Sequence, residues 1–175
     1  MVGFATAVDH GVPAAVAGRL ASAADLTLGE IRWPQDPQES LAHLAKGRTG
    51  WLAALPIDAG LPLPAGGSWA EALGAWRQPT LLVLRGDQLA TGVPAAATAL
   101  LQQCGVPLLG LVQAGGCWQA GERRRDGLPW LGGLVSASED GEPAGEDGIE
   151  GGPEQVLAVM RGLNLRDSGG FPQGA

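Results

Sequence analysis

Short apolar runs alternate with amphipathic segments along the first 134 residues of the chain. Runs that are apolar at consecutive positions predict buried strands, and they are VGFATA at 2–7, WLAALPI at 51–57, TLLVL at 80–84, LLGLV at 108–112 and LPWLG at 128–132. Strands that are apolar on both faces and separated by helices are typical of a parallel sheet covered on both sides. The pattern therefore predicts an α/β fold, with a mostly parallel sheet between two layers of helices.

The segments between these runs carry signals for the start of a helix. Two of them open with a capping box, and they predict helices over 37–46 and over 68–77. Two others carry a proline in the first turn, where its missing N–H costs nothing, and they predict helices over 13–24 and 94–104. We therefore expect a helix after most of the predicted strands.

Composition and charge limit the classes of protein to consider. The 175 residues are 45% apolar and 17% charged, which fits one globular domain with a buried core. The net charge is −7 and the only basic cluster is 123–125, so we expect no nucleic-acid partner. No apolar stretch approaches the roughly 18 residues needed to span a bilayer, and no leader pattern precedes the first strand, so we expect no membrane partner and a cytoplasmic location. Cys104 and Cys117 lack metal-ligand spacing and are expected to be unpaired thiols.

The composition changes after residue 135. The stretch SASEDGEPAGEDGIEGGP holds six acidic residues, no basic residue and many Gly and Pro. Such a segment buries too little apolar area to offset the entropy of ordering it. We predict a domain over 1–135, an acidic Gly/Pro-rich linker over 136–152, and a short helix with a tail over 153–175. A partner-binding role of the acidic segment is the alternative.

One connection between a strand and a helix resembles a known phosphate loop. The stretch TAVDHGVPAAV at 6–16 resembles, without a gap, the loop Thr-Gly-Thr-Asp-Thr-x-Val-Gly-Lys-Thr-Val of the dethiobiotin synthetases. Further segments resemble this family in the same order, and they are WPQDP at 33–37, DAGLPLP at 58–64, QPTLLVL at 78–84, LAT at 89–91, GVPLLGLV at 105–112 and GLPWLG at 127–132. The resemblance covers most of residues 2–134.

The resemblance implies a fold, an activity and an assembly. The fold would be that of the P-loop NTPases, and the cofactors would be ATP and Mg²⁺. The activity would be the ATP-dependent closure of a cyclic urea in biotin biosynthesis. The family's members are homodimers with substrate sites at the interface, so a homodimer, or a pair with a related protein, is expected.

The chemistry of the loop departs from the family. Pro13, Ala14 and Ala15 stand where the family has Gly, Lys and Thr. Pro13 lacks the N–H that would face a phosphate, Ala14 removes the cation, and Ala15 removes the hydroxyl ligand of Mg²⁺. Lys46 is the only lysine of the chain and falls at the end of a predicted helix. A segment that carries a further lysine in the family is interpreted as deleted between residues 26 and 32.

Few of the family's site positions keep compatible residues. The candidate ligand-binding residues are Thr6, Asp9, His10, Gly11, Thr91 and Gln113. Gln113 matches an Asn that reads adenine in the family, and its amide could still pair with the edge of a base. His10 beside Asp9 could act as a general base, but the sequence shows no nucleophile, and an exposed polar loop is the simpler interpretation. We predict no catalytic residue and no metal site.

The sequence thus predicts a dethiobiotin-synthetase-like pseudoenzyme that binds a partner or a small ligand. One alternative is a weak or divergent synthetase or ATPase, in which Arg19 or Arg85 replaces the missing lysine. A second alternative is a sensor of small anions that uses the backbone amides from Ala15 onward, at the start of the first helix.

Overall fold

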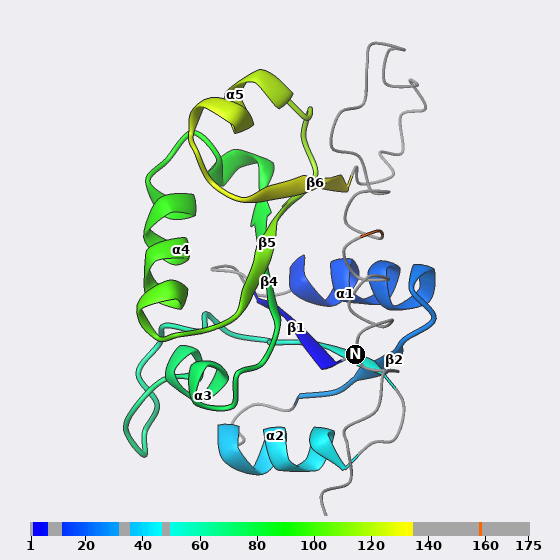
Figure 1. Cartoon of the computed structure of the whole chain (residues 1–175), viewed down its shortest axis with the longest axis vertical. Coiled ribbons are helices and arrows are strands. Elements are labelled where there is room, and N and C mark those ends of the chain that lie inside the picture. Colours follow the sequence, from blue (N-terminus) through cyan, green and yellow to red (C-terminus); the bar gives the residue numbers. More distant parts are fainter. Residues whose placement is uncertain (1, 7–11, 32–35, 47–49, 135–157, 159–175) are drawn as a thin grey trace, which may run out of the picture.

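The computed structural model describes residues 2–6, 12–31, 36–46, 50–134 and 158 of the chain. These residues form one six-stranded sheet in the order β2-β3-β1-β4-β5-β6, and every strand pair in it is parallel (Figure 1). The strands are β1 (Val2–Thr6), β2 (Thr27–Gly29), β3 (Trp51–Ala54), β4 (Thr80–Arg85), β5 (Leu108–Ala114) and β6 (Trp130–Leu134). The predicted α/β class with a parallel sheet flanked by helices is confirmed.

Each connection between successive strands contains a helix. The helices are α1 (Val12–Ala23), α2 (Pro37–Ala45), α3 (Trp69–Ala75), α4 (Val93–Gln103) and α5 (Ala120–Arg125), and a 3-10 turn, η1 (Gly86–Gln88), follows β4. None of the helices in the described part of the chain combines the length and the apolar character needed to cross a membrane.

The strand order explains which helices cover which face of the sheet. α1 carries the chain from β1 past β3 toward the β2 edge, whereas α2, α3 and α4 each carry it toward the β6 edge. Crossovers between parallel strands are almost always right-handed. Two helices whose connections move the chain toward opposite edge strands therefore lie on opposite faces of the sheet. α1 therefore covers one face, and α2, α3 and α4 cover the other (Figure 1).

Side chains of the central strand alternate between these two faces. Leu81 and Val83 belong to the buried cluster that includes Leu20 of α1, whereas Leu82 and Leu84 belong to the cluster under α2, α3 and α4. A strand that is buried on both faces reads as a continuous apolar run, which is the pattern TLLVL.

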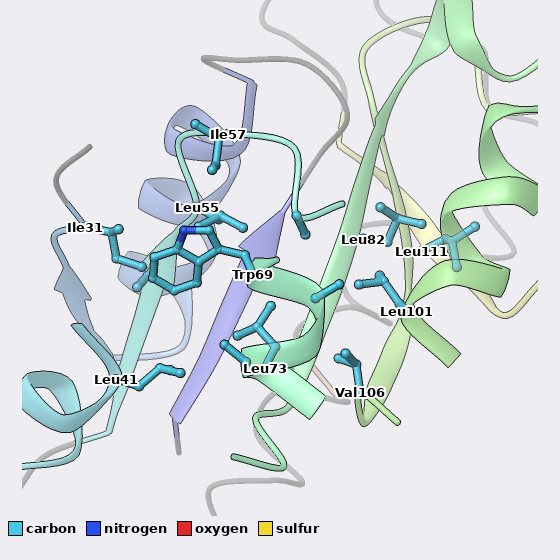
Figure 2. Close-up of a cluster of buried hydrophobic side chains, with 14 of the residues drawn as sticks. Ile31, Leu41, Leu55, Ile57, Trp69, Leu73, Leu82, Leu101, Val106 and Leu111 are labelled. Atoms are coloured by element: carbon cyan, nitrogen blue, oxygen red, sulfur yellow. The ribbon is translucent and has the colours of Figure 1, made fainter. Parts of the chain in front are cut away.

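The cluster under α2, α3 and α4 is centred on a tryptophan (Figure 2). Trp69 of α3 is only 1% exposed, and its ring extends toward Leu55 and Ile31. Leu73 of α3 and Leu101 of α4 lie in the same cluster and are equally buried. Burial of one such large side chain contributes about 2–3 kcal/mol, so this cluster is a major source of stability.

The two predicted capping signals are present in the structure. The Asp36 carboxylate accepts hydrogen bonds from the backbone N–H groups of Gln38 at 2.8 Å and Glu39 at 3.2 Å, at the start of α2. At the start of α3, the Ser68 hydroxyl accepts from the Glu71 N–H at 3.3 Å and donates to the Glu71 carboxylate at 3.1 Å. The caps therefore fix where both helices begin.

Two elements were not expected from the sequence. β2 lies in the segment that the resemblance marked as shortened, and it has only three residues, with Leu28 52% exposed. α5 contains the run of arginines, in which Arg123 is 9% exposed and lies over the Trp130 ring at 5.2 Å. The predicted linker at 136–152 and the helix predicted to begin at 153 lie outside the described residues, apart from Ala158.

Two glycines give a matched test of helix packing. A Cβ atom at Gly74 of α3 would lie 1.8 Å from the carbonyl oxygen of Cys104, whereas one at Gly18 of α1 would have no atom within 4 Å. We expect Gly74→Ala to lower the free energy of unfolding by about 2–3 kcal/mol, because the backbone of α4 must shift. We expect Gly18→Ala to raise it by about 0.5–1 kcal/mol, because alanine favours the helix. Urea denaturation measures both, and equal effects would contradict this packing.

Candidate functional site

The carboxyl ends of the strands gather at one edge of the sheet, and α1 begins there. β1 lies between β3 and β4, and the crossovers that leave β1 and β4 run in opposite directions. Open parallel sheets bind ligands outside the carboxyl ends of their strands, at the point where the crossover direction changes. The start of α1, at Val12, is therefore the position where this fold most favours a ligand.

A first hollow of about 430 Å³ lies beside the start of α1, toward the β2 edge of the sheet. Its lining is Pro13, Ala14, Leu28, Gly29, Glu30, Ile31, Ala54, Leu55 and Pro56. Among the described residues, Glu30 is the only charged one in this lining. The described lining is therefore mostly apolar and offers no cation that could hold a phosphate group.

A second hollow of about 410 Å³ lies on the other side of α1, toward the β6 edge. Its lining is Ala15, Val16, Arg19, Arg85, Gly86, Asp87, Ala114, Gly115, Gly116 and Leu134. It thus combines two cations with the backbone of the loops that follow β4 and β5. The lining of this hollow is suited to an anion.

One of the two arginines is partly neutralised within the second hollow. The Arg85 guanidinium forms an ion pair with Asp87, and its Nε donates to the Asp87 carboxylate at 2.9 Å. This hydrogen bond from Arg85 is the largest cause that holds the pKa of Asp87 below its ordinary value. Arg19 of α1 is the second cation in this lining.

Gln113 is buried and holds the loop that follows β5. Its side-chain nitrogen donates to the carbonyl oxygens of Gly115 at 2.8 Å and Cys117 at 3.2 Å, and the residue is 2% exposed. Its side-chain oxygen has no partner among the described residues. A Cβ at Gly86 would lie 2.9 Å from the Gly115 oxygen, so the loops after β4 and β5 touch through their backbones. Gln113 therefore fixes one wall of the second hollow.

The other residues selected from the sequence are placed differently. Thr6 ends β1 at the carboxyl edge, beside the start of α1, and Asp9, His10 and Gly11 lie outside the described residues. Thr91 is exposed and lines neither hollow. Its hydroxyl donates to the Gln88 carbonyl at 2.6 Å and accepts from the N–H of the first residue of α4 at 3.2 Å. In the structure, Thr91 thus stabilises the turn that leads into α4.

The single lysine lies at the amino ends of the strands, whereas α1 begins at their carboxyl ends. Lys46 is the last, capping residue of α2, and α2 leads from the carboxyl end of β2 to the amino end of β3. Because a crossover helix runs antiparallel to its strands, its last turn lies at the amino edge. Lys46 therefore cannot act as a cation at the start of α1.

Neither cysteine builds a catalytic or metal site with its described neighbours. Cys104 and Cys117 are free thiols. Burial raises the pKa of Cys104, and the Glu71 carboxylate raises that pKa further. Among the described residues, no group of three His, Cys, Asp or Glu side chains could hold a metal ion.

Sequence reasoning missed the glycines and the carboxylate of the second hollow. Gly115 and Gly116 both have positive φ angles, of 75° and 73°, and they directly follow β5. The doubled glycine at the end of a predicted strand was the available signal, since such backbone is needed where two loops approach closely.

Removal of the Gln113 amide tests its role in fixing this wall. We expect Gln113→Leu to lower the free energy of unfolding by about 1–3 kcal/mol, because two loop carbonyls lose their buried donor. Gln102→Leu, at an exposed position of α4, is the control and should change stability by less than about 0.5 kcal/mol. Urea denaturation measures the free energy of unfolding of both variants. Similar losses of stability in the two would show that Gln113 does not hold the loop.

Neither a scan against models of protein families nor a search of curated proteins finds a match to this chain.

Proposed function

We propose that the chain is a dethiobiotin-synthetase-like protein with a P-loop NTPase-like fold that has lost its ATP chemistry. It acts as a pseudoenzyme, by binding a protein partner or a small ligand. The observation that carries this proposal is the start of α1, where Pro13, Ala14 and Ala15 occupy the first turns at the carboxyl edge of the sheet.

The position of α1 supports the resemblance in fold. The stretch that resembles a phosphate loop connects the end of β1 to the start of α1, at the point where the crossover direction changes. Phosphate loops use the N–H groups and the positive end of such a helix. The backbone arrangement around this loop is therefore compatible with the proposed ancestry.

The side chains at this position support the loss of activity. Ala14 and Ala15 are exposed methyl groups in place of a cation and a hydroxyl. Among the described residues that line the hollow beside them, none is a cation, and Lys46 lies at the amino ends of the strands. One lost preorganised charge contact lowers a rate by roughly 10²–10³, so ATP-dependent ligation should be negligible.

A second candidate function is the binding of a small anion, or of a nucleotide held by arginine in place of lysine. Arg19 and Arg85 line the second hollow together with Ala15 of α1, which favours this candidate. Calorimetry with phosphate and with ATP, on the wild type and on Arg19→Ala, tests it. Loss of binding in the variant would support the candidate, and no binding by the wild type would exclude it.

The assembly and the location follow from the resemblance alone. We propose a homodimer, or a pair with a related protein, in the cytoplasm. Size-exclusion chromatography with mass determination tests the first point directly.

Restoration of the missing loop chemistry tests the main proposal. The triple variant Pro13→Gly/Ala14→Lys/Ala15→Thr should gain affinity for Mg-ATP by at least about 100-fold over the wild type, because it regains the cation and the hydroxyl. The matched control is Pro13→Gly/Ala15→Thr, which lacks the lysine and should gain little. Calorimetry measures binding, and thermal melting confirms that each variant is folded.

Two outcomes would contradict the proposal. Turnover of ATP and a diaminononanoate substrate by the wild type at an ordinary synthetase rate would exclude a pseudoenzyme. A folded triple variant that binds no more Mg-ATP than its control would show that this loop is not a converted phosphate loop.

A further inference from the structure

A third hollow, of about 480 Å³, is lined by residues of α2, of α3 and of the loop that precedes α3. Both helices lie on the face of the sheet opposite α1 (Figure 1). Its lining is Asp36, Pro37, Gln38, Leu63, Pro64, Ala65, Gly66, Gly67, Ser68, Glu71, Ala72 and Ala75. Its volume falls within the range of small-molecule sites. The function proposed above does not use this hollow.

One wall of the hollow is a closed loop that precedes α3. Pro62 and Ser68 form an antiparallel bridge at the base of the loop. Within it, the N–H of Leu63 donates to the Gly67 oxygen, and the N–H of Gly66 donates to the Leu63 oxygen, both at 2.9 Å. These bonds fix the shape of the loop, whose apolar surface is made of Leu63, Pro64 and Ala65.

The facing walls belong to two helices that are tied to each other. Pro37 of α2 and Ala72 and Ala75 of α3 contribute apolar surface. The Trp76 ring nitrogen, at the end of α3, donates to the side-chain oxygen of Gln38 at 2.5 Å. The hollow therefore has a defined shape and a mainly hydrocarbon lining.

Among the described residues, the charges in the lining are those of two carboxylates. Asp36 uses Oδ1 to cap α2, and Glu71 uses Oε2 to accept from Ser68, so each keeps a second oxygen with no bond in the described part of the chain. Neither carboxylate pairs with a cation among the residues described, and the lining contains no Lys or Arg. Each helix start contributes only about half a positive charge against a full negative one, so the charges of the described lining sum to a negative value.

We propose that this hollow binds a small aliphatic amine. The ammonium group would donate to the second oxygens of Asp36 and Glu71, while its hydrocarbon part would contact Leu63, Pro64 and Ala72. An ammonium group has three donors and no acceptor, which suits a lining with two carboxylates, and the apolar walls suit an alkyl chain. An anion or a free amino acid would place its carboxylate among like charges. This inference does not depend on the proposed function.

Calorimetry with hexylamine, hexanol and hexanoate on the full chain tests the proposal. These probes share one alkyl chain and differ in charge. We expect hexylamine to bind about tenfold tighter than hexanol, because of the two charge contacts, and hexanoate to bind weakest. Failure of hexylamine to bind, or equal affinity for the amine and the alcohol, would overturn the proposal.

Two variants remove the charges and keep the helix caps. Asn caps a helix as well as Asp does, and Gln replaces Glu in a capping box, so Asp36→Asn and Glu71→Gln should stay folded. Each should weaken hexylamine binding by about threefold to fivefold and leave hexanol binding unchanged. Glu39→Gln, an exposed residue of α2 outside the lining, is the control and should leave both affinities unchanged. An unchanged affinity for hexylamine in both capping variants would also overturn the proposal.

Discussion

The handedness of the crossovers is the constraint on which the rest of this structure depends. The chain leaves β1 toward one edge of the sheet and leaves β2, β3 and β4 toward the other. Right-handed crossovers then force α1 onto a face of its own among the described helices. The start of α1 falls where the direction changes, and a hollow opens on each side of it. The strand order and the direction of the crossovers are thus sufficient to determine where a ligand could bind.

Side chains decide what this place can do. A helix start attracts an anion by about 1 kcal/mol at most when exposed, which is far less than a nucleotide site needs. The first hollow adds a carboxylate from Glu30, and the second adds Arg19 together with an arginine already paired to Asp87. The fold therefore offers a favourable location, while Pro13, Ala14 and Ala15 at the start of α1 provide neither a cation nor a hydroxyl group.

The sequence was sufficient to predict the strands and helices whose signals are local. TLLVL is buried on both faces and was found for that reason, and Asp36 caps a helix as its spacing indicated. β2 escaped because three residues with an exposed Leu28 show no periodicity. α5 escaped because its consecutive arginines look fully solvated, although Arg123 lies over an aromatic ring. The role of Gln113 and the hollow between α2 and α3 depend on segments that meet only in the folded chain.

The isolation of Lys46 has a practical consequence. It is the only lysine of the chain, and it lies at the amino edge of the sheet, across the sheet from both hollows beside α1. A reagent that acylates lysine side chains would therefore modify a single side chain of this protein, to which a fluorophore or a surface tether could be attached. The carboxyl edge would stay open to ligands while the molecule is immobilised or observed.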